Sequence, residues 1–213
     1  MTSLHVLFEH SRYLHRLLKS RPALADEVAA AVDTPVTAIE LEVWLDRQDL
    51  TPDSLKAVLR QMKQLAYARV ATRDLAGLAN LAEVTETMTA IAELAVIRAQ
   101  ALIHAGLVER YGVPRGEQGR AQELMVLGMG KLGGRELNVS SDIDLIFVFP
   151  EDGHTDGRSP GAHSISNFEF FTRLGRALIN AIAELTEDGQ VFRVDMRLRP
   201  NGDSGFRRRT NDQ

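Results

Sequence analysis

The 213-residue sequence has no cysteine, and this excludes disulfide bonds, thiolate catalysis and cysteine-based zinc sites. The net charge is only -4, so no basic field favours a nucleic-acid partner. The N-terminus has no basic segment followed by an apolar stretch, as a secretory signal requires. Uninterrupted apolar runs such as residues 145–149 are far shorter than the roughly 20 residues that span a bilayer. We therefore expect a soluble cytoplasmic protein with no membrane partner.

Two regions of different composition follow one another along the chain. Residues 1–115 are rich in Leu, Ala, Glu and Arg and have few glycines, whereas residues 120–205 hold most of the glycines, β-branched runs and clustered aspartates. Turn-forming residues at 111–119 separate them. We predict a helical lead-in, a second structural unit and a divergent tail at residues 206–213.

The first region carries apolar residues at helical spacing in three segments. The first runs from Leu4 to Leu18, and the third runs from Val84 to Ala105. Between them, Thr51 is predicted to cap a helix whose first residue is Pro52. These stripes predict a bundle of helices that bury their apolar faces against one another.

The second region predicts strands at residues 123–127, 142–149 and 191–198, with a helix at residues 171–185. The strand at 123–127 reads as buried, and residues 151–163 read as a polar loop. The chain as a whole is therefore expected to be α+β, with a helical bundle followed by an α/β core around a small mixed sheet.

The aspartates Asp142 and Asp144 form the most informative pair in this core. They lie two residues apart on a predicted strand, so both side chains project from the same face. Two adjacent carboxylates repel each other, and a divalent cation relieves that repulsion. Mg²⁺ prefers one or two carboxylates together with substrate phosphates, which matches the pair.

A glycine pair, Gly133 and Gly134, precedes the aspartates by a short connection. Glycines allow the backbone to approach a ligand closely, and their N–H groups can bind an anion. Ser141 offers a hydroxyl donor to phosphate oxygens, and Lys131 offers a positive charge. We predict a phosphate-binding surface beside the metal pair.

A third carboxylate, Asp195, lies on the last predicted strand, and Arg193, Arg197 and Arg199 share its face. One acid among three arginines suits a site that holds metal and polyphosphate. With the earlier pair, Asp195 makes a two-metal site for phosphoryl transfer possible. A calcium loop is excluded because apolar residues follow Asp144 where further oxygen ligands are needed, and the aspartates come too soon after the glycines for a dinucleotide fold.

The Gly-Gly, spacer, Asp-x-Asp pattern is similar to the signature of DNA-polymerase-β-type nucleotidyltransferases. The longer strings at residues 128–147 and 192–205 resemble the family of bifunctional glutamine synthetase adenylyltransferase/adenylyl-removing enzymes. Residues 138–142 and Met129 look like the N-terminal, adenylyl-removing half of that family, and residues 71–79 look like its helical lead-in.

This resemblance implies that orthophosphate attacks the AMP on a tyrosine of adenylylated glutamine synthetase and releases ADP. Asp142, Asp144 and Asp195 would hold Mg²⁺, and Gly133, Gly134 and Ser141 would contact the phosphates. Lys131, Arg197 and Arg199 would neutralise phosphate charge. The other half of the family enzyme adenylylates with ATP, and a PII-type signal protein is an expected partner.

Family members are several times longer than this chain, and the tail at residues 206–213 departs from their pattern. The sequence therefore also fits a fragment. Such a fragment is either active or a catalytically silent module that only binds glutamine synthetase or the signal protein. A nucleotidyltransferase acting on a small molecule is a third hypothesis, and the specific strings argue against it.

Overall fold

The computed structural model describes residues 11–157, 164–195 and 206–208. The described helices are α2 (Arg12–Ser20), α3 (Pro22–Ala30), α4 (Ala38–Asp46), α5 (Leu55–Leu75), α6 (Leu81–Tyr111), α7 (Gly130–Gly133) and α8 (Asn167–Ala183). The strands are β1 (Pro114–Arg115), β2 (Met125–Met129), β3 (Ile143–Phe149), β4 (His154–Thr155), β5 (Val194–Asp195) and β6 (Phe206–Arg208). Helices dominate and the sheets are small and mixed, which confirms the predicted α+β class.

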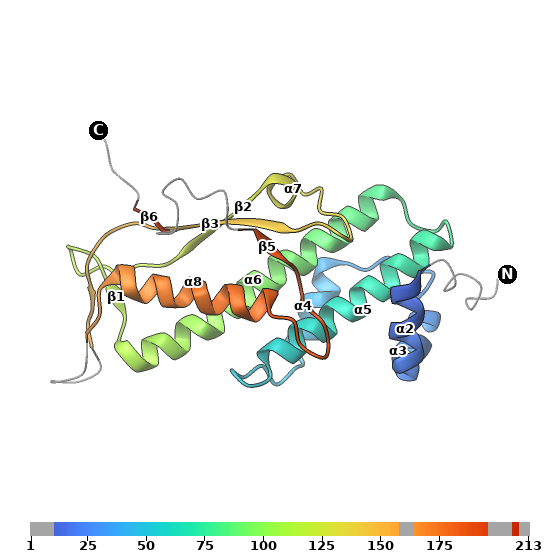
Figure 1. Ribbon diagram of the computed structural model, residues 1–213, viewed down its shortest axis with the longest axis horizontal. Coiled ribbons are helices and arrows are strands. Elements are labelled where there is room, and N and C mark those ends of the chain that lie inside the picture. Colours follow the sequence, from blue (N-terminus) through green and yellow to red (C-terminus); the bar gives the residue numbers. More distant parts are fainter. Residues whose placement is uncertain (1–10, 158–163, 196–205, 209–213) are drawn as a thin grey trace.

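The main sheet lies along one side of the long helices α6 and α8 (Figure 1). Strand β3 is central: it pairs antiparallel with β2 and parallel with β5 and β6. Strands β1 and β4 form a separate antiparallel pair. Every second residue of β3, beginning at Ile143, is buried, so one face of the strand packs on the helices and the other faces away.

Side-chain caps fix where the long helices begin. Asn80 accepts a hydrogen bond from the Glu83 backbone N–H at the start of α6, and Ser166 does the same for Glu169 at the start of α8. Each cap is followed three residues later by Glu, the capping-box pattern. Helix α6 ends at Gly112, whose φ of 84° favours glycine.

The assigned helix α5 begins at Leu55, three residues later than the predicted Pro52. The predicted cap is nevertheless present. The Thr51 hydroxyl accepts a hydrogen bond from the Ser54 N–H at 3.2 Å, and the Thr51 carbonyl accepts one from the Leu55 N–H at 2.9 Å. The first predicted stripe reaches into residues 1–10, outside the described part, and its remainder forms α2.

Two expectations for the second region are also corrected. Strand β2 begins at Met125 rather than residue 123, and it is not buried on both faces. Its outward side chains are exposed: Met125, Leu127 and Met129. The segment predicted as a polar loop contains β4. Its Thr155 is buried and is the register partner of Pro114 in β1.

The main hydrophobic core joins the helices to the sheet. It includes Met62 of α5, Ile91 of α6, Phe147 of β3 and Phe171 of α8, all fully or almost fully buried. The Phe149 and Phe171 rings stack with centroids 5.1 Å apart. One cluster therefore supports both the helical region and the strands that carry the aspartates.

Helix α6 is long and apolar enough, by length and composition alone, to cross a membrane. Charged residues such as Glu93 and Arg98 interrupt its apolar sequence, so the sequence shows no long apolar run there. In the described structure, α6 packs against α5 and α8 and contributes many residues to the core. The core helix of a soluble protein passes the same test, so this single helix is weak evidence of a membrane span.

A polar loop at residues 184–190 joins α8 to β5 and lies against α5. Lys63 of α5 donates to the Gln190 carbonyl at 3.0 Å, and its ammonium lies over the Phe192 ring. Burial, together with the nearby charge of Arg60, lowers the pKa of Lys63 to about 8.

This pKa predicts that stability increases above neutral pH. Between pH 8 and 10.5 the folded chain has released the Lys63 proton while the unfolded chain keeps it, so the free energy of unfolding increases with pH. The full increment is on the order of 3 kcal/mol. Urea denaturation across this range should show it in the natural chain and not in Lys63→Met. Parallel pH profiles for the two proteins would contradict the assignment.

Candidate metal and phosphate site

The pairing of β3 with β5 places two of the predicted carboxylates side by side. Asp144 and Asp195 are register partners on these parallel strands. Both side chains are partly exposed, and Asp144 belongs to the alternate positions of β3 that face away from the helices. The prediction that Asp195 lies on a strand neighbouring the Asp-x-Asp strand is confirmed.

Gly130 brings the backbone close to this pair. A Cβ atom at Gly130 would lie 2.8 Å from Oδ2 of Asp144, and its φ of 54° lies in the left-handed region. Met129, the preceding residue, is the register partner of Asp144 on β2. Glycine at position 130 therefore leaves room for the Asp144 carboxylate where β2 turns into α7.

Asp142 lies just before β3 and is held by an arginine. Arg193 donates Nε–H to Oδ1 of Asp142 at 2.6 Å, with both side chains largely exposed. The Arg193 carbonyl accepts a hydrogen bond from the Ile143 N–H at 2.9 Å, so side chain and backbone join the same two segments. This pair fixes Asp142 beside the strand that carries Asp195.

The turn before Asp142 is organised by Asn138. Ser141 donates its hydroxyl to Oδ1 of Asn138 at 2.8 Å and accepts from the Asn138 N–H at 3.3 Å. The Ser140 N–H and hydroxyl also donate to that amide oxygen. These bonds form a compact turn immediately before β3.

The glycine pair lies at the end of α7, with the two residues in different environments. A Cβ on Gly133 would lie 2.5 Å from the Gly128 carbonyl oxygen, so only glycine fits there. Gly134 donates its N–H to the Gly130 carbonyl at 3.0 Å, and a Cβ atom there would make only ordinary contacts, the nearest at 3.5 Å from the Gly130 carbonyl oxygen. Lys131 lies on α7 with an exposed side chain.

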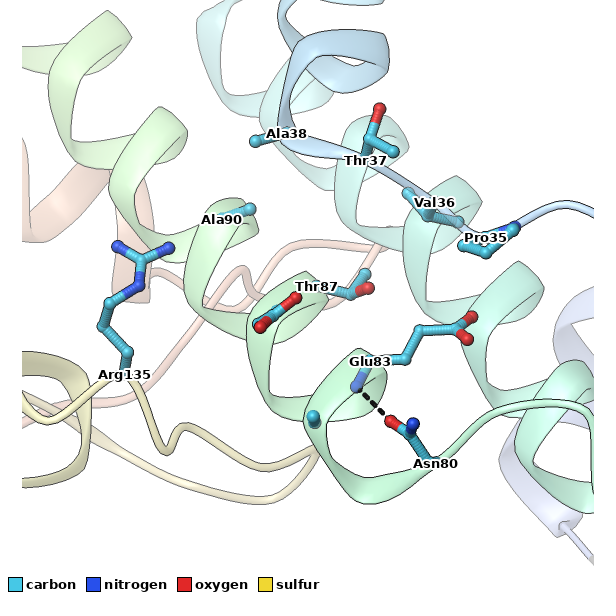
Figure 2. Close-up of a pocket in the computed structure, with 11 residues that line it drawn as sticks. Pro35, Val36, Thr37, Ala38, Asn80, Glu83, Thr87, Ala90 and Arg135 are labelled. Carbon is cyan, nitrogen blue, oxygen red and sulfur yellow. Dashed lines mark hydrogen bonds between the residues drawn. The ribbon is translucent and has the colours of Figure 1, made fainter.

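Two depressions border this part of the fold. One, of about 410 Å³, lies between α6 and β2 and is lined by Ile97, Val126, Gly133 and Leu145, among others. The other, of about 470 Å³, lies where the chain enters α4 and α6, with Arg135 across it (Figure 2). Neither of these two is lined by a predicted aspartate, and Asp144 lies on the face of β3 that points away from the helices.

The remaining predicted residues, Arg197 and Arg199, lie outside the described residues. Within the described part, no three Asp, Glu or His side chains converge closely enough to hold a metal ion by themselves. The adjacent pair Asp144 and Asp195, with Asp142 nearby, still fits Mg²⁺, because this ion typically takes one or two carboxylates and completes its shell with water and phosphate.

Sequence reasoning missed Gly130 and Asn138 and saw Arg193 only as one of several arginines. The signals were available in part. Gly130 precedes the glycine pair, and Asn followed by serines is a common turn former. Which carboxylate Arg193 would contact depends on side-chain rotamers, and the alternating pattern carries no such information.

A mixed sheet with carboxylates on adjacent strands, a glycine turn beside them and helices behind defines an α+β protein of the kind that includes nucleotidyltransferases. The family model for glutamate-ammonia ligase adenylyltransferase matches residues 1–212. The chain belongs to this family.

Curated relatives share the name bifunctional glutamine synthetase adenylyltransferase/adenylyl-removing enzyme. Those from Aromatoleum aromaticum, Burkholderia pseudomallei and Nitrosomonas europaea are 54%, 56% and 46% identical over 92%, 92% and 93% of this chain. The matched part is 20%, 22% and 22% of these relatives, so the chain spans about a fifth of their length.

Proposed function

We propose that this chain is the nucleotidyltransferase core that removes AMP from an adenylylated tyrosine of glutamine synthetase by phosphorolysis. The observation that carries the proposal is the pairing of Asp144 with Asp195 beside the turn at Gly130, in a chain of this family. The names of the relatives include adenylyl removal. The sequence strings at residues 128–147 and 192–205 favour the adenylyl-removing half and a polymerase-β-type core.

The carboxylates of Asp142, Asp144 and Asp195 would hold Mg²⁺ at the open face of the sheet. Bound there, the ion supplies positive charge to the phosphate oxygens at which charge develops during transfer. Arg193 keeps Asp142 at the edge of this group through its 2.6 Å bond. The Gly130 turn leaves the space that Asp144 needs.

The phosphates would lie over the turn that contains Lys131, Gly133 and Gly134, near Ser141. Because the Gly134 N–H is already bonded to Gly130, this glycine contributes close backbone approach rather than a free donor. Lys131 supplies a mobile positive charge, and Arg197 and Arg199 are proposed to supply two more.

The proposed reaction balances without a further co-reactant. An oxygen of orthophosphate forms a bond to the phosphorus of the tyrosine-bound AMP, and the bond between that phosphorus and the tyrosine oxygen breaks. The proton of hydrogen phosphate passes to the tyrosine oxygen. The products are ADP and unmodified tyrosine. The chain's residues hold the two phosphates in line for this displacement.

The test is to incubate the purified chain with adenylylated glutamine synthetase, orthophosphate and Mg²⁺ and to measure ADP. We expect ADP to form in the complete mixture and not to form when either orthophosphate or Mg²⁺ is omitted. Release of AMP instead would indicate hydrolysis and contradict phosphorolysis. A folded chain that binds adenylylated glutamine synthetase and yields no nucleotide would favour the silent binding module.

The proposed partners follow from this reaction. They are adenylylated glutamine synthetase, orthophosphate and ADP, with ATP used by the other half of the longer enzymes. A PII-type signal protein and a cytoplasmic location are proposed on the family resemblance alone.

A further inference from the structure

The loop at residues 184–190 is fastened to α5 by Arg60, whose side chain is 1% exposed. Arg60 donates Nε–H to the Gly189 carbonyl at 2.7 Å and Nη1–H to the Ala181 carbonyl at 3.1 Å. It also donates Nη2–H to the Glu184 carbonyl. Two of these carbonyls lie at the C-terminal end of α8, where helical partners are missing and positive charge is favourable.

Three more side chains hold the same loop. Gln64 of α5 donates to the Asp188 carbonyl at 3.0 Å, and Lys63 donates to the Gln190 carbonyl at 3.0 Å. Arg21, at the end of α2, pairs with the Asp188 carboxylate. The N-terminal helices and α5 thus hold the loop from several directions.

Hydrogen bonds continue from this loop to the proposed metal site. The Val191 N–H donates to the Ile182 carbonyl at 3.0 Å, which ties the segment after the loop to the last turn of α8. Two residues later, the Arg193 carbonyl accepts from the Ile143 N–H. In the register of β3 and β5, Ile143 pairs with Val194, and the next pair is Asp144 and Asp195.

We propose that Arg60 is a positioning residue that sets where β5, and therefore Asp195, lies relative to Asp144. The inference rests on the proposed function, because it assumes that this pair binds the metal. Residues 184–193 lead directly into β5, so the position of these residues bears on where the strand lies. Arg60 holds this segment by donating to backbone carbonyls. Substitution of a side chain in the loop would therefore leave these acceptors in place.

The experiment measures Mn²⁺ binding to the folded chain, with Mn²⁺ as an electron-paramagnetic stand-in for Mg²⁺ and no substrate present. Arg60→Met removes the donors and keeps a side chain of similar length. We expect the Kd for Mn²⁺ to increase by about threefold to tenfold. Residues that contact a metal ligand directly typically change metal affinity by about 10- to 100-fold, and Arg60 acts at a greater distance from the site.

Arg69→Met is the matched control on the same helix. Arg69 is 5% exposed and bonds to Glu40 and to the Thr34 carbonyl, so it holds the N-terminal helices and not the 184–190 loop. Its loss should lower stability to a similar degree and leave the Kd for Mn²⁺ unchanged. Gln64→Met, a milder change, removes one loop contact and should weaken Mn²⁺ binding less than Arg60→Met.

Asp195→Asn separates the two proposals. If Asp195→Asn weakens Mn²⁺ binding and Arg60→Met does not, the positioning role is wrong and the metal site stands. If Asp195→Asn leaves binding unchanged, the metal site itself is wrong. If Arg69→Met weakens binding as much as Arg60→Met does, the effect is general destabilisation and the positioning role is overturned. If Arg60→Met does not fold, Gln64→Met decides by the same comparison.

Discussion

Replacing Asp144 with asparagine should lower the rate of ADP release from adenylylated glutamine synthetase by about 100- to 1,000-fold. Asparagine keeps the shape of the side chain and removes the negative charge, so metal binding weakens while β3 stays intact. Asp144 is the register partner of Asp195 on the parallel strands and lies close to the Gly130 turn. Initial rates of ADP formation at saturating substrate measure the effect.

Asp46→Asn provides the control for this experiment. Asp46 is an exposed carboxylate at the end of α4 that pairs with Arg98, far in sequence from the sheet. Its replacement should leave the rate within about twofold, since exposed ion pairs contribute little. An Asp144→Asn protein that keeps the natural rate would remove the carboxylate pair from the mechanism and with it the proposed chemistry.

The long helices were predictable because their signals are local. Helix α6 follows from an apolar stripe of steps of three and four, with Asn80 at its start and Gly112 at its end. The boundaries of α5 and β2 were less predictable. The cap at Thr51 was predictable, but the assigned helix begins three residues after it, at Leu55. Strand β2 has alternate exposed residues and begins at Met125, so its apolar sequence overstated both its length and its burial.

Some features of the candidate site were likewise predictable from the sequence, and others were not. The neighbouring strand of Asp195 follows from strand period and strand order. The strand predicted to begin at Asp142 begins instead at Ile143, so Asp142 lies just before β3 and is bonded to Arg193. The bond from Arg193 to Asp142, the Asn138 turn and the hold of Arg60 on the 184–190 loop join residues 51, 3 and up to 129 positions apart. The Asn138 turn is local, but the other two contacts are long-range. The Arg60 bonds depend on how α5 packs against α8, and the Arg193 bond depends on how the segment before β5 lies against the start of β3. No periodic pattern within a single helix or strand encodes either arrangement.

The two adjacent glycines should respond in opposite ways to alanine. Gly133→Ala places a methyl group 2.5 Å from the Gly128 carbonyl oxygen, a backbone atom of β2 that cannot move without disturbing the sheet. We expect a loss of about 1–3 kcal/mol in the free energy of unfolding. Urea denaturation followed by fluorescence of Trp44, the only tryptophan, measures this loss. An unchanged denaturation midpoint would show that the α7 turn does not approach β2 as closely as described.

Gly134→Ala tests the phosphate role without that steric conflict. Its methyl group would lie 3.5 Å from the Gly130 carbonyl oxygen, an ordinary contact, and its φ of -80° suits alanine. Stability should therefore stay the same or increase by about 0.4–1 kcal/mol, because alanine restricts the unfolded chain. If the phosphates approach this turn, the same methyl group should raise the KM for orthophosphate severalfold in a fully folded protein. A KM equal to that of the natural chain would mean that Gly134 does not contact phosphate, and the anion-binding role would then fall to Lys131 and the arginines alone.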